Sequence, residues 1–380
     1  MHTSIHILKG SALEMGAVPS ESIDLIVTSP PYPMIEMWDS VFTRQAPHIR
    51  TDLEQGRGAE AFAGMHTLLD AAWLECDRVL RPGGIICINI GDATRTLNRD
   101  FQLYSNHSRI LQHFRSHGYV VLPDILWRKQ TNAPNKFLGS GMLPVGAYVT
   151  YEHEYILILR KGARRTFQSE AEKSLRRESA FFWEERNIWF SDIWQDIKGT
   201  PQELMDKKTR ERSGAFPFEL AYRLICMFSV KGDRVLDPFA GTGTTLAAAL
   251  TAARNGIGME IEARLTELAG QLLQNLPQFA VAFTRKRLER HIAFVEQRTL
   301  DKGPPKHRNE PYGFPVMTRQ ERTLLLNEAS GLQAEGDGRY RMTYHPGPGP
   351  CPDRNPIRAA EAAFPAGRQK TRKTQGTLPF

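Results

Sequence analysis

The chain has 380 residues, of which 41% are hydrophobic and 24% are charged, as in an ordinary globular protein rather than a disordered or fibrous one. No run of about 18 apolar residues occurs, and the N-terminus lacks the pattern of a signal peptide, so we expect a cytoplasmic protein without a membrane span. The four cysteines are scattered without metal-binding spacing, which predicts no metal site. The formal net charge of +7 is compatible with a nucleic-acid partner but does not by itself indicate one.

Residues 1–160 alternate between helical and strand patterns, as is typical of a parallel sheet. Apolar runs bounded by turn residues predict strands, and apolar residues at helical spacing predict the helices between them. A proline and two glycines at 82–84 separate one helix from a fully apolar strand, as expected for a strand buried on both faces. The expected strands are 23–27, 85–90 and 152–161, with a helix at 62–80 and a further helix and strand within 108–129.

This alternation stops over 161–212, where arginines and lysines mix with phenylalanines and tryptophans. We expect an insertion on the sheet rather than a strand of it. Basic residues at its start are numerous enough to grip phosphates but not to read a base sequence, and a solvated charged face is the alternative. The candidate DNA-binding residues are Arg160, Lys161, Arg164 and Arg165.

Alternation returns over 213–300 and ends at about residue 301. We expect helices at 214–229 and 242–253, strands at 233–241 and 255–261, and a long charged helical stretch at 263–298. Residues 301–380 form a Pro/Gly-rich extension with one short helical candidate at 318–329 and a basic end.

The segment "RVLDPFAGTGTTLAAAL" predicts a strand, a glycine turn and a helix. Gly241 and Gly243 allow the backbone to turn tightly beneath a ligand and open the helix N-terminus to it. It is not a P-loop, because no lysine follows, and Glu260 ends the next strand at an offset suited to ribose hydroxyls. We therefore expect nucleoside binding here, with a tight turn without a ligand as the alternative.

The segment "TSPPYP" follows the first strand directly. Pro30 and Pro31 hold their backbone extended, so that carbonyl oxygens point outward, while Ser29 offers a hydroxyl and Tyr32 a flat face. Acceptors beside an aromatic ring suit a planar ligand with an exocyclic amino group. A plain Pro-Pro turn is the alternative.

Together the two segments resemble the amino-methylating DNA methyltransferases, which transfer a methyl group from S-adenosylmethionine to an exocyclic nitrogen of a base. The family's (D/N/S)-P-P-(Y/F) motif is matched at 29–32, its F-x-G-x-G motif at 239–243, and its acid after the next strand at Glu260. The catalytic motif precedes the cofactor motif, which is similar to the permuted beta class. The resemblance implies an α/β, Rossmann-like S-adenosylmethionine-dependent methyltransferase fold with permuted motif order, an inserted recognition region and an extended C-terminal tail.

The resemblance also implies domains and site residues. It divides the chain into a catalytic half (1–160), a target-recognition insertion (161–212), a cofactor-binding half (213–300) and the extension (301–380). The implied catalytic residues are Ser29, Pro30, Pro31 and Tyr32. The implied cofactor-binding residues are Ser11, Phe216, Asp237, Pro238, Phe239, Ala240, Gly241, Thr242, Gly243, Thr244, Glu260 and Ile261. Two positions depart from the family pattern, since Ser11 stands in place of an acid, and Arg212 and Ser213 stand where His-Pro is frequent.

By the same resemblance, the Ser29 hydroxyl and the Pro30 carbonyl accept the two N–H bonds of an extruded base, and Tyr32 stacks on it. In that family, enzymes with serine before Pro-Pro mostly methylate N4 of cytosine, whereas enzymes with aspartate or asparagine there mostly methylate N6 of adenine. We expect cytosine N4 in duplex DNA, within a restriction-modification system, with N6-adenine methylation as the alternative. An RNA methyltransferase is disfavoured by motif order, and an inactive DNA-binding protein is disfavoured by the intact motifs.

The C-terminal end suggests one further partner. Gln375, Leu378 and Phe380 are spaced like a short peptide that docks on a DNA sliding clamp. The sequence leaves a homodimer open.

Overall fold

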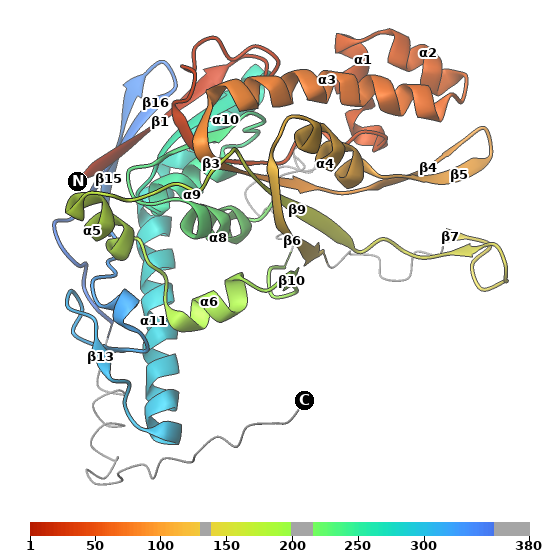
Figure 1. Cartoon of the computed structure of the whole chain (residues 1–380). Helices are drawn as coiled ribbons and strands as arrows, with labels where there is room; N and C mark the ends of the chain where they lie inside the picture. The colour runs from red at the N-terminus through yellow and green to blue at the C-terminus, as the bar shows by residue number, and fades with distance from the viewer. Residues whose placement is uncertain (130–137, 199–215, 353–380) are drawn as a thin grey trace.

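Strands of mostly apolar residues form one sheet across the centre of the fold (Figure 1). The computed structural model describes residues 1–129, 138–198 and 216–352. Within that part of the chain the sheet has ten strands in the order β10-β6-β9-β3-β2-β11-β12-β1-β16-β15. Five neighbouring strands are parallel: β3 (Leu80–Ile90), β2 (Ile23–Thr28), β11 (Arg234–Asp237), β12 (Asn255–Glu260) and β1 (His2–Lys9). β9 (His153–Arg160) is antiparallel to both β3 and β6 (Val120–Arg128).

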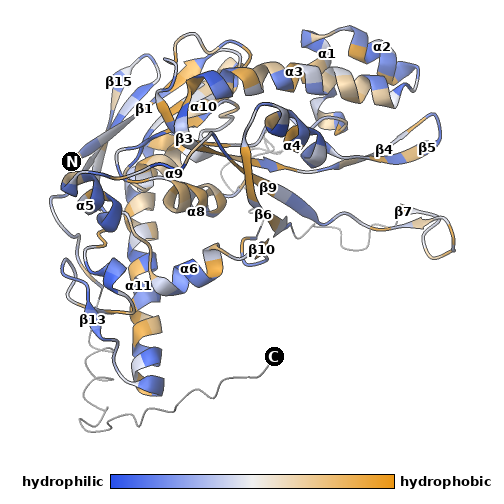
Figure 2. Ribbon diagram, in the orientation of Figure 1, coloured by the Kyte–Doolittle hydropathy of each residue, from blue (hydrophilic) through white to orange (hydrophobic). Residues whose placement is uncertain are grey.

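Helices cover both faces of the sheet, because alternate residues of each strand point to opposite sides. Ile26 packs into a core cluster that includes Trp73 of α3 (Gly58–Val79), whereas its neighbour Leu25 packs into a second cluster that includes Leu220 of α8 (Phe218–Phe228). Figure 2 shows hydrophobic residues concentrated on α8, α9 and the central strands. The covering helices are α3 (Gly58–Val79) and α4 (Asn106–Ser116) on one face, and α8 (Phe218–Phe228) and α9 (Thr244–Thr251) on the other.

The connections reverse direction between β2 and β11, the two neighbours at the centre of the sheet. β11 leads through α9 to β12 on one side, and β2 leads through α3 to β3 on the other. In open α/β sheets the crevice for ligands forms at the carboxyl ends of the strands where such a reversal occurs. Both sequence motifs, at 29–32 and 237–244, follow these two carboxyl ends directly.

Two hairpins leave the sheet edge that carries this crevice. The first, β4 (Ala93–Leu97) and β5 (Asp100–Tyr104), follows β3, and the second, β7 (Leu138–Gly139) and β8 (Ala147–Tyr148), lies between β6 and β9. Figure 1 shows both projecting on the same side of the molecule. The smaller remaining elements are η1 (Glu36–Trp38), α1 (Asp39–Gln45), α2 (His48–Glu54), β13 (His307–Arg308) and β14 (Pro315–Val316).

The insertion after β9 corrects one prediction. Its described part holds α5 (Glu170–Glu178), α6 (Trp183–Trp189) and β10 (Ile193–Trp194), and β10 pairs with β6 as an edge strand of the sheet. The prediction of no strand in this insertion was therefore wrong. Trp194 is fully buried there, and its ring supplies the apolar area that fixes so short a strand.

The C-terminal part also differs from the expectation. The stretch at 263–298 is two helices, α10 (Ala263–Gln274) and α11 (Leu276–Lys302), and the candidate helix at 318–329 holds only the 3-10 turn η2 (Arg319–Glu321). β15 (Ala329–Gly336) and β16 (Arg339–Tyr344) form a hairpin that extends the main sheet beside β1. Residues 307–344 are therefore folded onto the domain, because alternating apolar residues such as Met342 and Tyr344 complete a buried core.

None of the described helices is both long enough and apolar enough to cross a lipid bilayer.

Candidate active site

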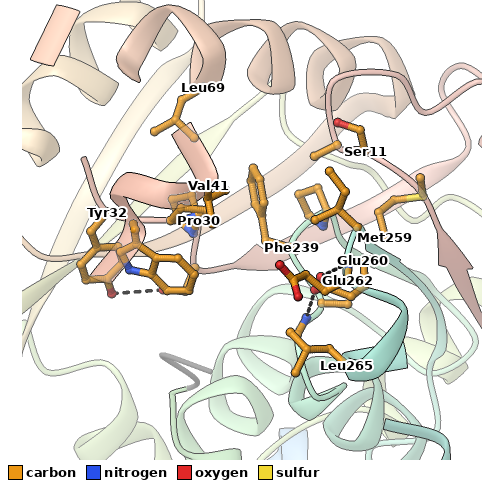
Figure 3. A pocket seen from close by; sticks show the side chains of 18 of the residues that line it. Ser11, Pro30, Tyr32, Val41, Leu69, Phe239, Met259, Glu260, Glu262 and Leu265 are labelled. Carbon is orange, nitrogen blue, oxygen red and sulfur yellow. Dashed lines mark hydrogen bonds between the residues drawn. The ribbon is translucent and has the colours of Figure 1, made fainter. Parts of the chain in front are cut away.

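A cavity of about 1200 Å³ opens at the carboxyl ends of β2, β11 and β12. Figure 3 shows Tyr32 and Pro30 at one end, Met259 and Glu260 at the other, and Phe239 between them. The structure thus brings the two sequence motifs into one pocket, although more than 200 residues separate them. The sequence-predicted residues that line the pocket are Ser11, Ser29, Pro30, Pro31, Tyr32, Phe216, Asp237, Pro238, Phe239, Ala240, Gly241, Thr244, Glu260 and Ile261.

Tyr32 is fixed at the pocket wall by its hydroxyl. That hydroxyl donates to Glu154 Oε2 at 2.9 Å and accepts from Asn89 Nδ2 at 2.8 Å and from Ser29 Oγ at 3.1 Å. Burial of the phenol, with the Glu154 carboxylate beside it, raises the pKa of Tyr32 well above its ordinary value. The tyrosine therefore stays protonated and serves as a neutral hydrogen-bonding centre.

Glu154 is the anchor of this group. It is buried, and its two oxygens also accept from Asn89 Nδ2 at 2.6 Å and from Lys129 Nζ at 2.8 Å. A buried carboxylate needs such donors, because removing its charge from water is costly. The sequence analysis missed Asn89, Lys129 and Glu154. The signal for Asn89 was a single polar residue within the apolar run 85–90, and the signal for Glu154 was an acid directly before the run 155–159.

Asp237 joins the catalytic and cofactor motifs. Its carboxylate accepts from Thr28 Oγ1 and Thr245 Oγ1, each at 2.6 Å, and from the Phe239 amide at 3.1 Å. Full burial raises the pKa of Asp237 to about 6, although the three donors oppose the shift. Asp237 therefore holds the end of β2 and the glycine turn in one geometry.

The glycine turn is closed against Glu260. The Gly241 amide donates to Glu260 Oε2 at 2.8 Å, and the Glu262 amide donates to Oε1 at 2.8 Å. Gly241 has a φ of +52°, which favours glycine, and an ideal Cβ there would meet only Phe239 O, at 4.0 Å. Burial raises the pKa of Glu260. The turn backbone is therefore open on its pocket side.

Thr242 and Gly243 are correctly placed on the turn but do not line the pocket. Thr242 is buried, and Gly243 begins α9 with a φ of +79°. A Cβ at Gly243 would lie 3.2 Å from Ala269 Cβ, so glycine allows the turn to pack closely on α10. These two residues support the turn rather than face a ligand. Ser11 lines the pocket, and its Oγ accepts from the Leu13 amide at 3.2 Å.

The residues at this end of the pocket fit S-adenosylmethionine. Glu260 lines the pocket with a carboxylate to which ribose hydroxyls could donate, and Phe239, Met259 and Leu265 give it apolar walls that could take a planar base. The open Gly241 backbone admits a ligand close to the turn, as the sequence predicts for a nucleoside.

The four basic residues do not line the pocket, and the expectation that they contact DNA stays a prediction. Arg160 ends β9 six residues after Glu154, which places it about 20 Å along the strand. Its Nε donates to Gly162 O, Lys161 Nζ pairs with Asp77 at 3.2 Å, and Arg165 pairs with Asp233 at 2.6 Å. Arg164 is exposed at the same end. Two members of this cluster, Lys161 and Arg165, thus pair with acids of the same chain and would have to break those pairs to bind phosphate.

Two predictions fall outside the described residues. These are the sliding-clamp peptide at Gln375–Phe380, and the departure at Arg212 and Ser213.

A sheet in this order, with a serine-proline-proline-tyrosine turn and a glycine turn in one pocket, is the architecture of S-adenosylmethionine-dependent methyltransferases that act on amino groups. The family model described as DNA methylase, for N6 and N4 methyltransferases, matches residues 23–271. The chain therefore belongs to the N6/N4 DNA methylase family, with its motifs in the beta-class order, and its cofactor is S-adenosylmethionine. The predictions of family, fold and cofactor are confirmed.

Similar proteins span most of the chain. The type II methyltransferase M.MthZI of Methanothermobacter thermautotrophicus is 48% identical over 327 residues, which is 86% of this chain and 91% of that protein. The type II methyltransferase M.MjaI of Methanocaldococcus jannaschii is 48% identical over 274 residues, or 69% of this chain and 89% of that protein. A solved structure from Thermus thermophilus, assigned as a DNA modification methylase and complexed with S-adenosyl-L-methionine, has a TM-score of 0.55 and 32% identity. The match covers 71% of this chain and 95% of that one.

Proposed function

We propose that this chain is a site-specific methyltransferase that modifies the exocyclic N4 of cytosine in duplex DNA, as the modification enzyme of a type II restriction-modification system. The observation that carries the proposal is the Ser29 hydroxyl in the pocket, oriented by its hydrogen bond to Tyr32. The similar proteins M.MthZI and M.MjaI are both named type II methyltransferases, which supports the assignment to a type II restriction-modification system.

The hydrogen bonds around Tyr32 orient the serine as an acceptor. The Tyr32 hydroxyl donates its single proton to Glu154. Its oxygen can therefore only accept hydrogen bonds from Ser29 and Asn89. Ser29 thereby commits its proton to Tyr32 and keeps its own lone pairs for a ligand. A base amino group can then donate to Ser29 Oγ and to the Pro30 carbonyl, which directs the nitrogen lone pair out of the ring plane.

Positioning supplies the rest of the catalysis. S-adenosylmethionine supplies an electrophilic methyl group when bound. Glu260 and the Gly241 turn would hold that cofactor at one end of the pocket, while the Ser29–Tyr32 turn would hold the amino group at the other, so that one cavity would keep the two reactants together. The base must leave the duplex to enter, which costs a few kcal/mol of unstacking.

Cytosine is favoured over adenine by the residue before Pro-Pro. A serine hydroxyl whose proton is held by Tyr32 accepts from the amino group, and it carries no charge. In this family serine goes mostly with cytosine, and aspartate or asparagine mostly with adenine. Adenine N6 is the alternative target.

Methyl transfer to defined substrates tests the proposal. The full chain is incubated with tritiated S-adenosylmethionine and unmodified duplex DNA or, in parallel, RNA, and the labelled nucleoside is identified by mass spectrometry. We expect N4-methylcytosine from duplex DNA alone. N6-methyladenine would replace the cytosine assignment with its alternative, and label only in RNA, or in neither substrate, would refute DNA methylation.

A further inference from the structure

We propose that the apolar hairpin, defined as residues 138–149 and containing β7 and β8, is a wedge that enters the base stack of duplex DNA beside the target base. The inference rests on the proposed function, because it assigns the surface that engages the DNA during extrusion of the base. It also replaces the basic cluster at Arg160–Arg165 as the expected contact.

The apolar hairpin projects from the edge of the sheet that carries the pocket. The strand before it, β6, leads to Lys129, and the strand after it, β9, begins at His153. Lys129 and Glu154 both line the pocket and pair with each other, so the two strands that bear the hairpin meet at the pocket rim. The proposal therefore places DNA that presents a base to this pocket alongside the hairpin.

Contacts with the neighbouring hairpin, β4–β5, hold the apolar hairpin in place. The rings of Tyr148 and Phe101 are stacked with centroids 4.6 Å apart and an interplanar angle of 7°. Nearer the sheet, Tyr151 donates to Asp92 Oδ2 at 3.1 Å, and Asp92 also binds His107 at 2.7 Å. The two hairpins are thus joined at two levels, and Figure 1 shows them extending together on one side.

The exposed surface of the hairpin is apolar to an unusual degree. Met142 is 86% exposed, Leu143 69% and Val145 99%. Of the 18 exposed large hydrophobic side chains among the described residues, five lie within 142–149, and no residue of 138–149 is charged. Contiguous exposed apolar residues of this kind mark an interaction site, because exposing them to water is unfavourable.

The base stack is the occupant that the geometry favours. A base that leaves the duplex opens a gap between its neighbours, and methionine, leucine and proline side chains are those that proteins insert between base steps. The hairpin tip carries Met142, Leu143 and Pro144 in succession and no cation of its own. In this proposal, exposed basic residues near the hairpin would contact the phosphates. One of them is Arg99, at the turn of the β4–β5 hairpin.

Single-turnover methylation of two duplexes tests the wedge. Both contain the target sequence, first identified by modification-sensitive sequencing of DNA from cells that express the chain. In one duplex the target base is paired, and in the other it faces an abasic site, so that extrusion is easier. The full chain is compared with the combined variant Met142→Ser, Leu143→Ser, Val145→Ser. The control is Leu74→Ser, Leu300→Ser, whose two side chains are each 51% exposed outside the hairpin.

We expect the hairpin variant to be about tenfold or more slower than wild type on the paired duplex and within about threefold of it on the abasic duplex. Its affinity for S-adenosylmethionine and the rates of the control variant should be unchanged. Equal rates for variant and wild type on both duplexes, or an equal loss on both, would overturn the wedge. The wedge would also be overturned if the wild type is a dimer and the hairpin variant is a monomer, because the apolar surface would then bind a second copy of the chain. Failure of the wild type to methylate either duplex would instead remove the proposed function itself, and the wedge with it.

Discussion

The Tyr32 hydroxyl donates to the Glu154 carboxylate at 2.9 Å, although the two residues lie 122 positions apart in the chain. Tyr32 follows β2 and Glu154 is the second residue of β9, so the contact spans β3, the strand between them. Through this bond the buried carboxylate sets the direction of every hydrogen bond in the group, up to the Ser29 hydroxyl. The proposed acceptor in the pocket is therefore oriented from a distant strand.

Replacing Glu154 by glutamine should slow methyl transfer through this network. Asn89, Lys129 and Tyr32 all donate hydrogen bonds to the Glu154 carboxylate. The NH2 group of a glutamine would face at least one of these donors, so at least one hydrogen bond must break. The Tyr32 hydroxyl proton would then no longer be held in one orientation. We expect a loss of about tenfold to a hundredfold in kcat with unchanged affinity for S-adenosylmethionine, measured by transfer assays and calorimetry.

A double-mutant cycle separates this positioning role from a loss of stability. In a Tyr32→Phe background the Glu154→Gln change should add little to the loss in kcat, because the hydroxyl through which it acts is gone. Glu152→Gln, at the exposed neighbour that pairs with Arg128, is the matched control and should retain wild-type kcat. Additive losses in kcat would contradict action through Tyr32.

Asp237→Asn should change how stability depends on pH. Burial raises the pKa of Asp237 from 3.8 to about 6 in the folded state, so folding favours the protonated form. The contribution of this group is full below about pH 4 and is lost as pH rises through about 6. In urea unfolding the free-energy difference between wild type and variant should fall by roughly 2 kcal/mol from pH 4 to pH 7. A difference that is constant over that range would contradict the assignment.

Lys231→Met should stabilise the protein. The ammonium is buried near Arg254 and Arg287, and within the described part of the chain its Nζ has no hydrogen-bond partner. Burial lowers the pKa of Lys231 from 10.5 to about 7, so wild-type stability rises with pH between these values, where the unfolded chain binds the extra proton. We expect a gain of about 1 to 3 kcal/mol in unfolding free energy at pH 7. The control Lys302→Met, at an exposed position, should change it by less than about 0.5 kcal/mol.

Glu260→Ala should weaken cofactor binding before it affects the chemical step. It removes the acceptor of the Gly241 and Glu262 amides as well as the proposed partner of the ribose hydroxyls. We expect the Kd for S-adenosylmethionine to rise about tenfold or more by calorimetry. Glu262→Gln, at the rim of the same pocket, removes a partly exposed ion pair with Arg44 and leaves the Glu260 carboxylate in place, so it should change the Kd by less than about threefold. Equal effects of the two changes would show that the pocket rim, not the Glu260 carboxylate, governs affinity.

The sequence was most informative where chemistry and backbone conformation are local. The apolar strands, the proline turn at Ser29–Tyr32 and the glycine turn at Gly241 are each encoded within a few residues, and the structure places them as expected. Glu154 could not be found in this way, because its partner Tyr32 is brought to it only by the strand order.

Surface charge and edge strands were predicted less well for a related reason. The arginines and lysines at 160–165 resemble a phosphate-binding run, but their acidic partners, such as Asp77 and Asp233, lie far away in the chain. The strand β10 has only two residues and pairs along the edge of β6, and β16 pairs along the edge of β1, so both depend on a longer strand that lies far away in the chain.

The rate of methyl transfer by Ser29→Ala tests the central claim most directly. Single-turnover transfer is measured on the target duplex, with binding of S-adenosylmethionine and DNA measured on the same preparation. We predict binding within about threefold of wild type and a transfer rate lower by about a hundredfold or more, because the oriented acceptor of the amino group is gone. A variant that binds both partners and transfers methyl groups at the wild-type rate would contradict the account.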